Sequence, residues 1–312
     1  MSNVDLPWQS VTWFDVTEHQ DGQRIDNFLF TRLKGVPKSR IYRLIREGEV
    51  RVNKKRIKPE TKLTEGDQIR VAPIRFVQPD QEVVPVSDQM AKGLLKRIVY
   101  EDEGLLVVNK PSGLAVHGGS GVNVGLIETL RHATGKSYLE LIHRIDRDTS
   151  GLVMISKKRS VLKTLQDYLR EHKIQKTYAA IVKGVITLDE QLIDAPLLRY
   201  ELANGERRVR VDAKEGKPSQ TKFVVAERYQ KSTLVYASPY SGRTHQIRVH
   251  GLSIGHPLLG DEKYGHQVEF VGPQPRRLCL HAMKLEIPGY PVIEAGLPED
   301  MQNMVARLRR PV

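Results

Sequence analysis

Residues 141–157 read LIHRIDRDTSGLVMISK and join a charged segment to an apolar run. The run GLVMIS, at residues 151–156, has the length and composition of a buried strand. Just before it, two aspartates lie among two arginines and a histidine. Asp148, Thr149 and Ser150 are residue types that commonly form turns. The stretch therefore predicts a turn leading into a core strand, and it raises the question of whether one of the two carboxylates does chemistry.

The composition is that of a folded protein. The chain has 312 residues, of which 39% are hydrophobic and 28% are charged, enough for one large domain or two ordinary ones. Its apolar runs all fall short of the roughly 18 residues needed to cross a bilayer. The first residues do not resemble a secretory signal, so we expect a cytoplasmic protein with no membrane contact. The single cysteine, Cys279, can form no internal disulfide.

The charge of the chain indicates a polyanionic partner. The net charge is +12 and the pI is about 9.6, and nucleic acid is the commonest partner of a protein this basic. The charge is unevenly distributed, because residues 21–72 hold 14 Lys or Arg and 7 Asp or Glu, which is +7 of the +12. We therefore expect the amino-terminal part of the chain to contact the polyanion.

The amino-terminal part is predicted to form two helices and a small sheet. The segment QRIDNFLFTRL, at residues 23–33, spaces its apolar residues as one helical face. A second helix is expected at RIYRLIREGE, with Ser39 as its N-cap and Gly48 at its end. Helical spacing places Ile41, Leu44 and Ile45 on one face of this second helix and Arg40, Arg43 and Arg46 on the other.

The remaining chain is predicted to be a larger α+β domain behind a linker. Residues 74–95 contain scattered prolines and have weak periodicity, which is typical of a linker. Beyond them, strand patterns outnumber helix patterns, and most strands follow one another directly or through hairpins. This order favours a mixed, largely antiparallel sheet.

Several cofactor and metal motifs fail on inspection. GSGVNVG at 119–125 is too long between its last glycines for a dinucleotide fingerprint, and TGKS at 134–137 lacks the earlier glycine of a phosphate-binding loop. His245 and His250 are five residues apart and do not share a helical face. We therefore expect no cofactor and no metal. The sequence also has no Gly-x-Ser-x-Gly elbow for covalent serine hydrolysis.

Polar residues nevertheless cluster in segments that otherwise look like core. Taken together, HRIDRDTSG (143–151), KTY (176–178) and GRTHQIRVH (242–250) resemble the signature motifs of the RluA family of pseudouridine synthases. RLCLHA (277–282) and NKPSG (109–113) also match motifs of that family, in the same order. The segments RIDNFL, SRIYRLIREGEVRVNKKRIK and GDQIRV resemble an S-four type RNA-binding domain, or alpha-L motif.

The resemblance implies that the protein isomerises uridine in RNA. The bond between uracil N1 and ribose C1′ is cleaved, the base turns, and C5 joins C1′. Asp146 is implied to be catalytic, with Arg248 as its salt-bridge partner, and Tyr178 either stacks on uracil or removes the C5 proton. Whether Asp146 attacks C1′, adds to C6 or removes a sugar proton on the way to a glycal stays open. The target base must be flipped out of the RNA, so Arg144 is a candidate to replace or clamp it and Leu280 to pack beneath it.

The resemblance also implies a partner and a division of the chain. His143 and Thr149 join the expected substrate-binding residues. The branch that the motifs match best modifies 23S (large-subunit) ribosomal RNA, so we expect this RNA as partner and a monomer as the active form. A sibling synthase acting on transfer RNA or other ribosomal uridines, and a silent RNA-binding or ribosome-assembly protein, stay open as alternatives.

The expected RNA-binding residues are Lys38, Arg40, Arg43, Arg46, Lys54, Lys55 and Arg56. The expected units are an extension (1–20), the RNA-binding domain (21–73), the linker (74–95) and the synthase domain (96–312).

Overall fold

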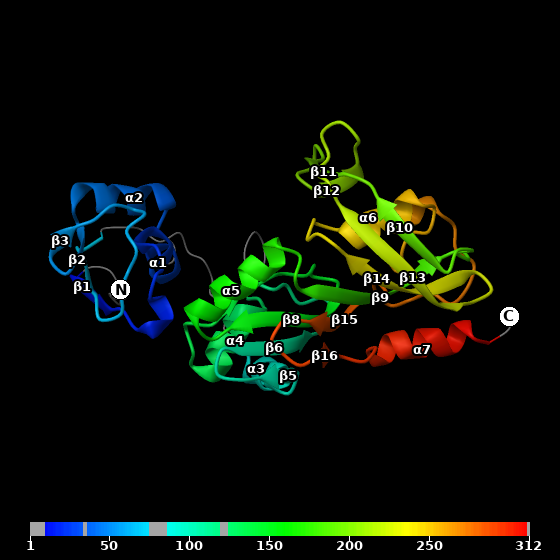
Figure 1. The fold of residues 1–312 in the computed structure, drawn as a ribbon, viewed down its shortest axis with the longest axis horizontal. Coiled ribbons are helices and arrows are strands. Elements are labelled where there is room, and N and C mark those ends of the chain that lie inside the picture. Colours follow the sequence, from blue (N-terminus) through cyan, green and yellow to red (C-terminus); the bar gives the residue numbers. More distant parts are fainter. Residues whose placement is uncertain (1–9, 34–35, 75–85, 119–123, 311–312) are drawn as a thin grey trace, which may run out of the picture.

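The amino-terminal part of the chain is a small sheet packed against two helices (Figure 1). The structure is a computed structural model that describes residues 10–33, 36–74, 86–118 and 124–310. The strand order of this first sheet is β1-β4-β2-β3. The apolar faces predicted for both helices are buried in one core between helices and sheet. The elements are β1 (Thr12–Asp15), the short 3-10 helix η1 (Glu18–Gln20), α1 (Ile25–Arg32), α2 (Lys38–Glu47), β2 (Val50–Val52), β3 (Lys55–Arg56) and β4 (Gln68–Val71).

Two details of this part differ from the sequence prediction. The predicted extension 1–20 contains β1, which pairs with β4 along its whole length, so the sheet begins before residue 21. The N-cap of α2 is Pro37 rather than Ser39, because proline presets the backbone for the start of a helix and cannot donate a hydrogen bond there. Gly48 ends α2 as predicted, in a left-handed conformation with φ +78°.

The predicted linker 74–95 is wrong at both ends. Ile74 is buried in the amino-terminal core. Residues Asp88–Leu95 form α3, whose N-cap Ser87 accepts a hydrogen bond from the Met90 amide at 3.2 Å. Leu94 of α3 packs into the core of the larger domain, so this helix belongs to that domain. Residues 75–85 lie outside the described residues.

The larger domain is built on a ten-stranded sheet with the main order β10-β13-β14-β9-β15-β8-β6-β5. The predicted antiparallel character is confirmed, since β15 and β8 are the one parallel pair that the described strands form. The strands β10 to β12 were not predicted, because they are short, charged and half exposed. The strands are β5 (Ile98–Glu101), β6 (Leu105–Lys110), β7 (Glu140–Leu141), β8 (Ser150–Ser156), β9 (Gln175–Lys183), β10 (Glu190–Asp194), β11 (Leu197–Glu201), β12 (Arg207–Val211), β13 (Gln220–Arg228), β14 (Ser232–Pro239), β15 (Leu280–Glu286) and β16 (Ile293–Glu294).

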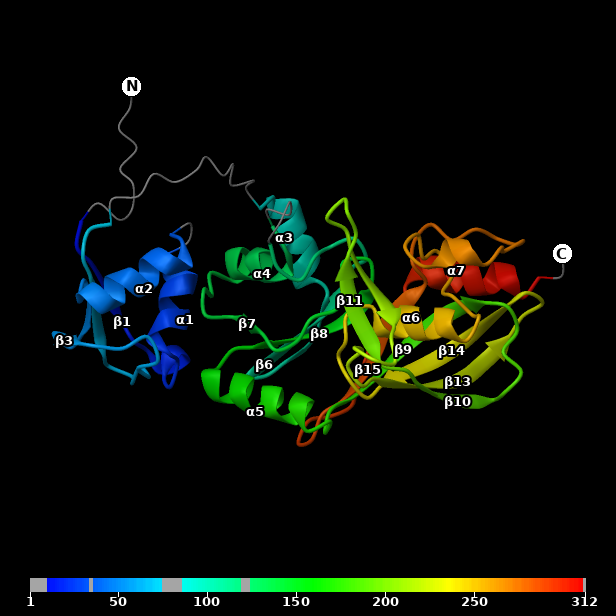
Figure 2. The same ribbon diagram turned by 90° about the horizontal axis from the view of Figure 1, so that it is seen from above.

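Helices cover both faces of this sheet. Helices α3 and α4 pack on one face of β6 and β8, and α5 packs on the opposite face (Figure 2). At the other half of the sheet, α7 covers β9 on one side and α6 lies on the other. Strands β11 and β12 form a separate hairpin that contacts α6. The helices are α4 (Leu126–Thr134), α5 (Arg159–Arg170), α6 (Gln246–Ser253), the short 3-10 helix η2 (Gly265–Gln267) and α7 (Glu299–Leu308).

The parallel contact between β8 and β15 explains the last glycine of the 143–151 motif. Gly151 has φ +115° and lies opposite Ala282. A Cβ atom at this position would lie 2.2 Å from the Ala282 carbonyl oxygen, so only glycine fits. Next to it, the Ser150 hydroxyl lies 2.8 Å from His281 Nδ1. The charged loop before β8 is therefore held directly beside β15.

Candidate active site

Asp146 lies in the loop between β7 and β8, at the junction of two cavities. The Thr149 amide donates to the Asp146 carbonyl at 3.2 Å, which closes the turn that the sequence predicted. The larger cavity has a volume of about 1170 Å³ and the smaller one about 80 Å³, and Asp146 lines both. Its side chain is 21% exposed. The carboxylate can thus be reached by a bound molecule while its backbone is held in a turn.

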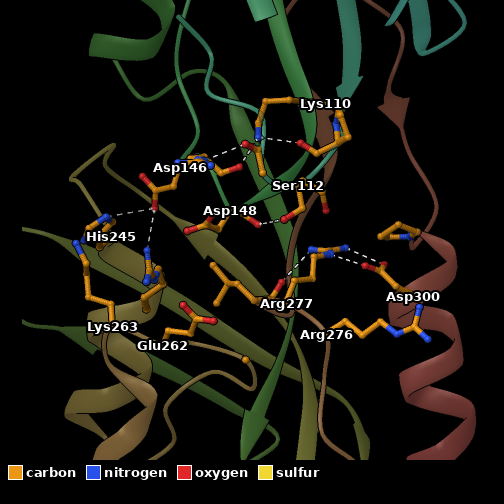
Figure 3. Close-up of a pocket in the computed structure, with 18 of the residues that line it drawn as sticks. Lys110, Ser112, Asp146, Asp148, His245, Glu262, Lys263, Arg276, Arg277 and Asp300 are labelled. Atoms are coloured by element: carbon orange, nitrogen blue, oxygen red, sulfur yellow. Dashed lines mark hydrogen bonds and ion pairs between the residues drawn. The ribbon is translucent and has the colours of Figure 1, made fainter. Parts of the chain in front are cut away.

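A buried lysine fastens this loop to the end of β6. Lys110 is fully buried, and its Nζ donates to the carbonyls of Pro111, Leu114 and Arg147 at 3.1, 2.7 and 2.9 Å. The Ser112 hydroxyl donates to the Asp148 carbonyl at 2.6 Å (Figure 3). Burial lowers the pKa of Lys110 to about 7, and the nearby Asp148 and Asp146 carboxylates oppose that shift. The NKPSG segment thus acts as a clamp on the loop that carries Asp146.

Arg248 faces Asp146, but its hydrogen-bonded partner is a different carboxylate. Arg248 Nη1 lies 3.8 Å from Asp146 Oδ2. Its Nε and Nη2 donate to the two oxygens of Asp261 at 2.8 and 2.7 Å. The side chains of Arg248 and Asp261 are 6% and 0% exposed. Burial works against the charged guanidinium, yet Asp261 and then Asp146 leave the pKa of Arg248 raised. The expected salt bridge between Arg248 and Asp146 is thus present at 3.8 Å, whereas the bidentate hydrogen bonds of Arg248 go to Asp261.

His245 is a second group directed at the same carboxylate. It precedes α6, and its Nε2 lies 4.0 Å from Asp146 Oδ2 (Figure 3). Its Nδ1 lies 2.7 Å from the hydroxyl of Tyr264. The contacts of His245 and Arg248 both fall on Oδ2, and no hydrogen bond or ion pair from the described residues reaches the second carboxylate oxygen, Oδ1.

The smaller cavity is lined by predicted site residues from three strands or loops. Tyr178 from β9 and Leu280 from β15 are buried there, with Thr149 beside them. The Thr149 hydroxyl has no hydrogen-bond partner among the described residues although the side chain is 2% exposed. Burial, and then the Asp146 charge, raise the pKa of Tyr178 well above its ordinary value. The tyrosine is therefore a neutral phenol near pH 7.

The larger cavity is lined by charges of both signs, with basic groups in excess. Exposed Arg144 lines both cavities. Arg277 donates to both carboxylate oxygens of Asp300 at the start of α7, whereas Arg276 extends away from that pair (Figure 3). The basic residues of the lining, apart from His245, are Arg97, Lys110, Arg144, Arg147, Arg208, Arg248, Lys263, Arg276 and Arg277. A cavity of this size and charge suits a polyanion better than a small neutral ligand.

The structure does not bring His143 to either cavity. Its Nε2 accepts a hydrogen bond from the Met154 amide at 3.0 Å, and His143 is not among the described residues that line the two cavities. Burial lowers the pKa of His143 to about 3. The ring therefore joins the loop to β8 as a neutral acceptor, and the expected role of His143 in substrate binding stays a prediction.

Two of the predicted RNA-binding residues line one groove of the amino-terminal domain. Arg46 and Arg56 line a groove of about 430 Å³ together with Lys58 and exposed Tyr42. Arg43 is in an exposed ion pair with Glu47, with 2.7 Å between Nε and Oε1, which reduces its free charge. Arg40 is half-buried, and the members of the predicted set that are exposed are Lys38, Arg43, Arg46, Lys54, Lys55 and Arg56.

Two absences hold for the part of the chain that the structure describes. In the described ranges, His, Cys, Asp and Glu side chains form no cluster of three or more that could hold a metal ion. Across the same ranges, none of the helices is long and apolar enough to pass through a bilayer.

Sequence reasoning missed three residues of the site. Asp261 and Tyr264 lie in GDEKYG at residues 260–265, which reads as an ordinary polar turn. His245 was part of a recognised motif but had no assigned role. The signal that identifies all three is burial with short hydrogen bonds, and a single sequence does not carry that signal.

Comparisons with known proteins agree with this arrangement. The model of the RNA pseudouridylate synthase family matches residues 104–253, and the model of the S4 domain matches residues 23–69. The chain is 50% identical to the Escherichia coli K12 protein named ribosomal large subunit pseudouridine synthase C over 311 residues, covering 96% of this chain and 97% of that one. Its Pasteurella multocida namesake is 48% identical over 314 residues, with 96% and 95% covered. The solved human RNA pseudouridylate synthase domain containing 4 has a TM-score of 0.60 and 26% identity, over 71% of this chain and 96% of that chain.

Proposed function

The chain belongs to the RNA pseudouridylate synthase family, and from this membership we propose that it isomerises specific uridines of 23S ribosomal RNA to pseudouridine. The observation that carries the proposal is the position of Asp146, a partly exposed carboxylate between a large basic cavity and a small cavity that Tyr178 and Leu280 help to line. The large cavity suits folded RNA and the small one suits a flipped base. The curated relatives at about 50% identity, named for the large ribosomal subunit, support the choice of RNA.

We propose that Asp146 acts at the sugar or the base of the flipped uridine. Breaking the bond between N1 and C1′ develops positive charge at the ribose, which a nearby carboxylate can capture or stabilise, as in glycoside cleavage. The base then turns, C5 bonds to C1′, the C5 proton leaves and N1 gains a proton. Arg248, anchored by Asp261, keeps a positive charge beside Oδ2.

Tyr178 is proposed to stack on the uracil as a neutral phenol and to take the C5 proton. Because burial disfavours the phenolate, the hydroxyl must pass its own proton on as it accepts the new one. At that stage the Asp146 carboxylate, whose charge acts on Tyr178, receives this proton and passes it to solvent, and N1 takes its proton from solvent. Tyr178→Phe should bind RNA normally but form product slowly, with a primary isotope effect on 5-deuterated uridine. An unchanged rate without an isotope effect would limit Tyr178 to stacking.

Three other residues are proposed to hold the nucleotide. Thr149 has a buried hydroxyl without a partner among the described residues, which supports a hydrogen bond to the flipped nucleotide. Leu280 is proposed to pack beneath the base. Exposed Arg144 lines both cavities, which supports a role in filling the place that the flipped base leaves.

The amino-terminal domain is proposed to anchor the RNA. Arg46 and Arg56 line a groove beside exposed Tyr42, and basic grooves with an aromatic side chain suit RNA. We propose that residues up to 74 form this domain and residues 86–312 the synthase domain, with the boundary in between. We also propose a monomer that acts in the cytoplasm, where ribosomal RNA is processed.

The test is to incubate large-subunit ribosomal RNA with the protein and to map pseudouridine by carbodiimide modification and primer extension. Wild type should give stops at a few defined uridines, and Asp146→Asn should give none while still binding RNA. Asp148→Asn is the matched control, because Asp148 is exposed and only its backbone carbonyl accepts a hydrogen bond in the loop. It should keep most of the activity. Product only in transfer RNA would indicate a sibling synthase, and absence of product would indicate a silent RNA-binding protein.

A further inference from the structure

His245 connects the catalytic carboxylate to a buried tyrosine. Its backbone has φ +53°, which residues with a side chain rarely adopt. In this conformation its Nδ1 lies 2.7 Å from Tyr264 Oη and its Nε2 lies 4.0 Å from Asp146 Oδ2. Strained backbone is retained where the surrounding structure requires it, often at functional sites. The His245 ring thus spans the distance from Tyr264 to Asp146.

The hydrogen bonds around Tyr264 determine which nitrogen of His245 carries the proton. The Val209 amide donates to Tyr264 Oη at 3.0 Å. Tyr264 is buried, so its own hydroxyl hydrogen needs an acceptor, and Nδ1 of His245 is the acceptor at 2.7 Å. Burial lowers the pKa of His245 to about 4, so the ring is neutral near pH 7 and carries one proton. That proton is on Nε2, which faces Asp146.

We propose that His245, held by Tyr264 as its Nε2–H tautomer, is a positioning residue that fixes Asp146 Oδ2 together with Arg248 and so presents Oδ1 to the flipped uridine. This inference rests on the proposed function and adds a residue to it. At 4.0 Å the contact is longer than a hydrogen bond. Such contacts tighten when the substrate is bound. A neutral N–H orients the carboxylate without adding a second buried cation beside Arg248.

A single turn supports both groups that converge on Oδ2. Asp261 anchors Arg248 and Tyr264 anchors His245, and the Tyr264 amide donates to Asp261 Oδ1 at 3.0 Å. The same turn is bound to the β11–β12 hairpin, because Lys263 Nζ donates a hydrogen bond to the Arg207 carbonyl at 3.0 Å. The hairpin residue Arg208 lines the large cavity. The position of Asp146 therefore depends on a support that includes part of the proposed RNA-binding surface.

Tyr264→Phe is the sharpest test, because it removes the hydroxyl and keeps the ring over Arg248, whose Cζ lies 5.1 Å from the ring centroid. The single-turnover rate at saturating RNA should fall about tenfold or more, the size of effect known for groups that orient a metal-ligating histidine, while RNA affinity stays within about twofold. Tyr100→Phe is the control. It loses a 2.8 Å hydrogen bond to Asp102, and neither residue lines either cavity, so its rate should not change. Equal rates for Tyr264→Phe and wild type would overturn the inference.

The tautomer of His245 provides a second measurement, and this measurement would not change if Tyr264 had a merely structural role. Nitrogen NMR of histidine-labelled protein should show His245 protonated at Nε2 in the wild type and a mixture of tautomers in Tyr264→Phe. His245→Gln, which keeps a donor near the Nε2 position, should retain more activity than His245→Leu. A proton on Nδ1 in the wild type would overturn the inference. If the wild type made no pseudouridine, the proposed function would fall instead, and the NMR result would still decide where the proton lies.

Discussion

Asp261→Asn tests whether the buried pair behind the active site sets its stability and its geometry. Asp261 accepts two hydrogen bonds from Arg248 at 2.8 and 2.7 Å, and both side chains are almost fully buried. Removing one charge of a buried pair costs about 3–5 kcal/mol. We expect about 3 kcal/mol, since Asp146 remains 3.8 Å from Arg248 as a weaker counter-ion. In a domain of this size that lowers the melting temperature by roughly 6–12 °C. Activity should fall as well, because Arg248 is then free to turn toward Asp146.

Two comparisons make this measurement decisive. Thermal unfolding of Glu227→Gln is the matched control, because Arg309 and Glu227 form the same bidentate geometry at 2.8 and 2.7 Å on the surface, where such pairs contribute little. The double variant Arg248→Met with Asp261→Leu should be more stable than Asp261→Asn, since no charge is left buried alone. A loss below about 1 kcal/mol for Asp261→Asn, equal to that of the surface control, would refute the reasoning.

Three further perturbations have defined outcomes. Gly151→Ala should lower the free energy of unfolding by denaturant by about 4 kcal/mol or more, because its Cβ would lie 2.2 Å from a carbonyl oxygen of β15. Gly296→Ala is the control and should be neutral, because its Cβ would meet nothing within 4 Å. The double variant Arg46→Glu with Arg56→Glu should weaken RNA binding and reduce the slope of log affinity against log salt by about 2. Its turnover on a minimal stem-loop should be unchanged. An unchanged slope would contradict the anchoring role. His143 has its pKa lowered to about 3 by burial, so below pH 6.5 the unfolded chain binds a proton that the folded chain does not. The stability advantage of wild type over His143→Gln should therefore shrink by about 1–2 kcal/mol between pH 7 and pH 5, and a constant difference would contradict this.

Local patterns predicted the elements well where one face is buried. The inner face of α2 and the hairpin of β13 and β14 follow directly from apolar spacing and turn residues. The linker was misjudged because Asp88–Leu95 is a short helix whose burial depends on α4, and prolines before it weakened the pattern. Strands β11 and β12 were missed because charged residues occupy them and their partner is α6 rather than a continuous core.

The sequence by itself determined the family, the basic amino-terminal domain and Asp146 as the candidate carboxylate, because those features depend on residue types at fixed short spacings. Only the tertiary structure decided the partners of that carboxylate. Asp261 and Tyr264 lie more than a hundred residues from Asp146 in the chain, in a turn that reads as an ordinary surface loop. Their roles follow from being buried against Arg248 and His245. Hydrogen bonds gain this influence when folding removes water from around them, and spacing along one chain does not report where water is excluded.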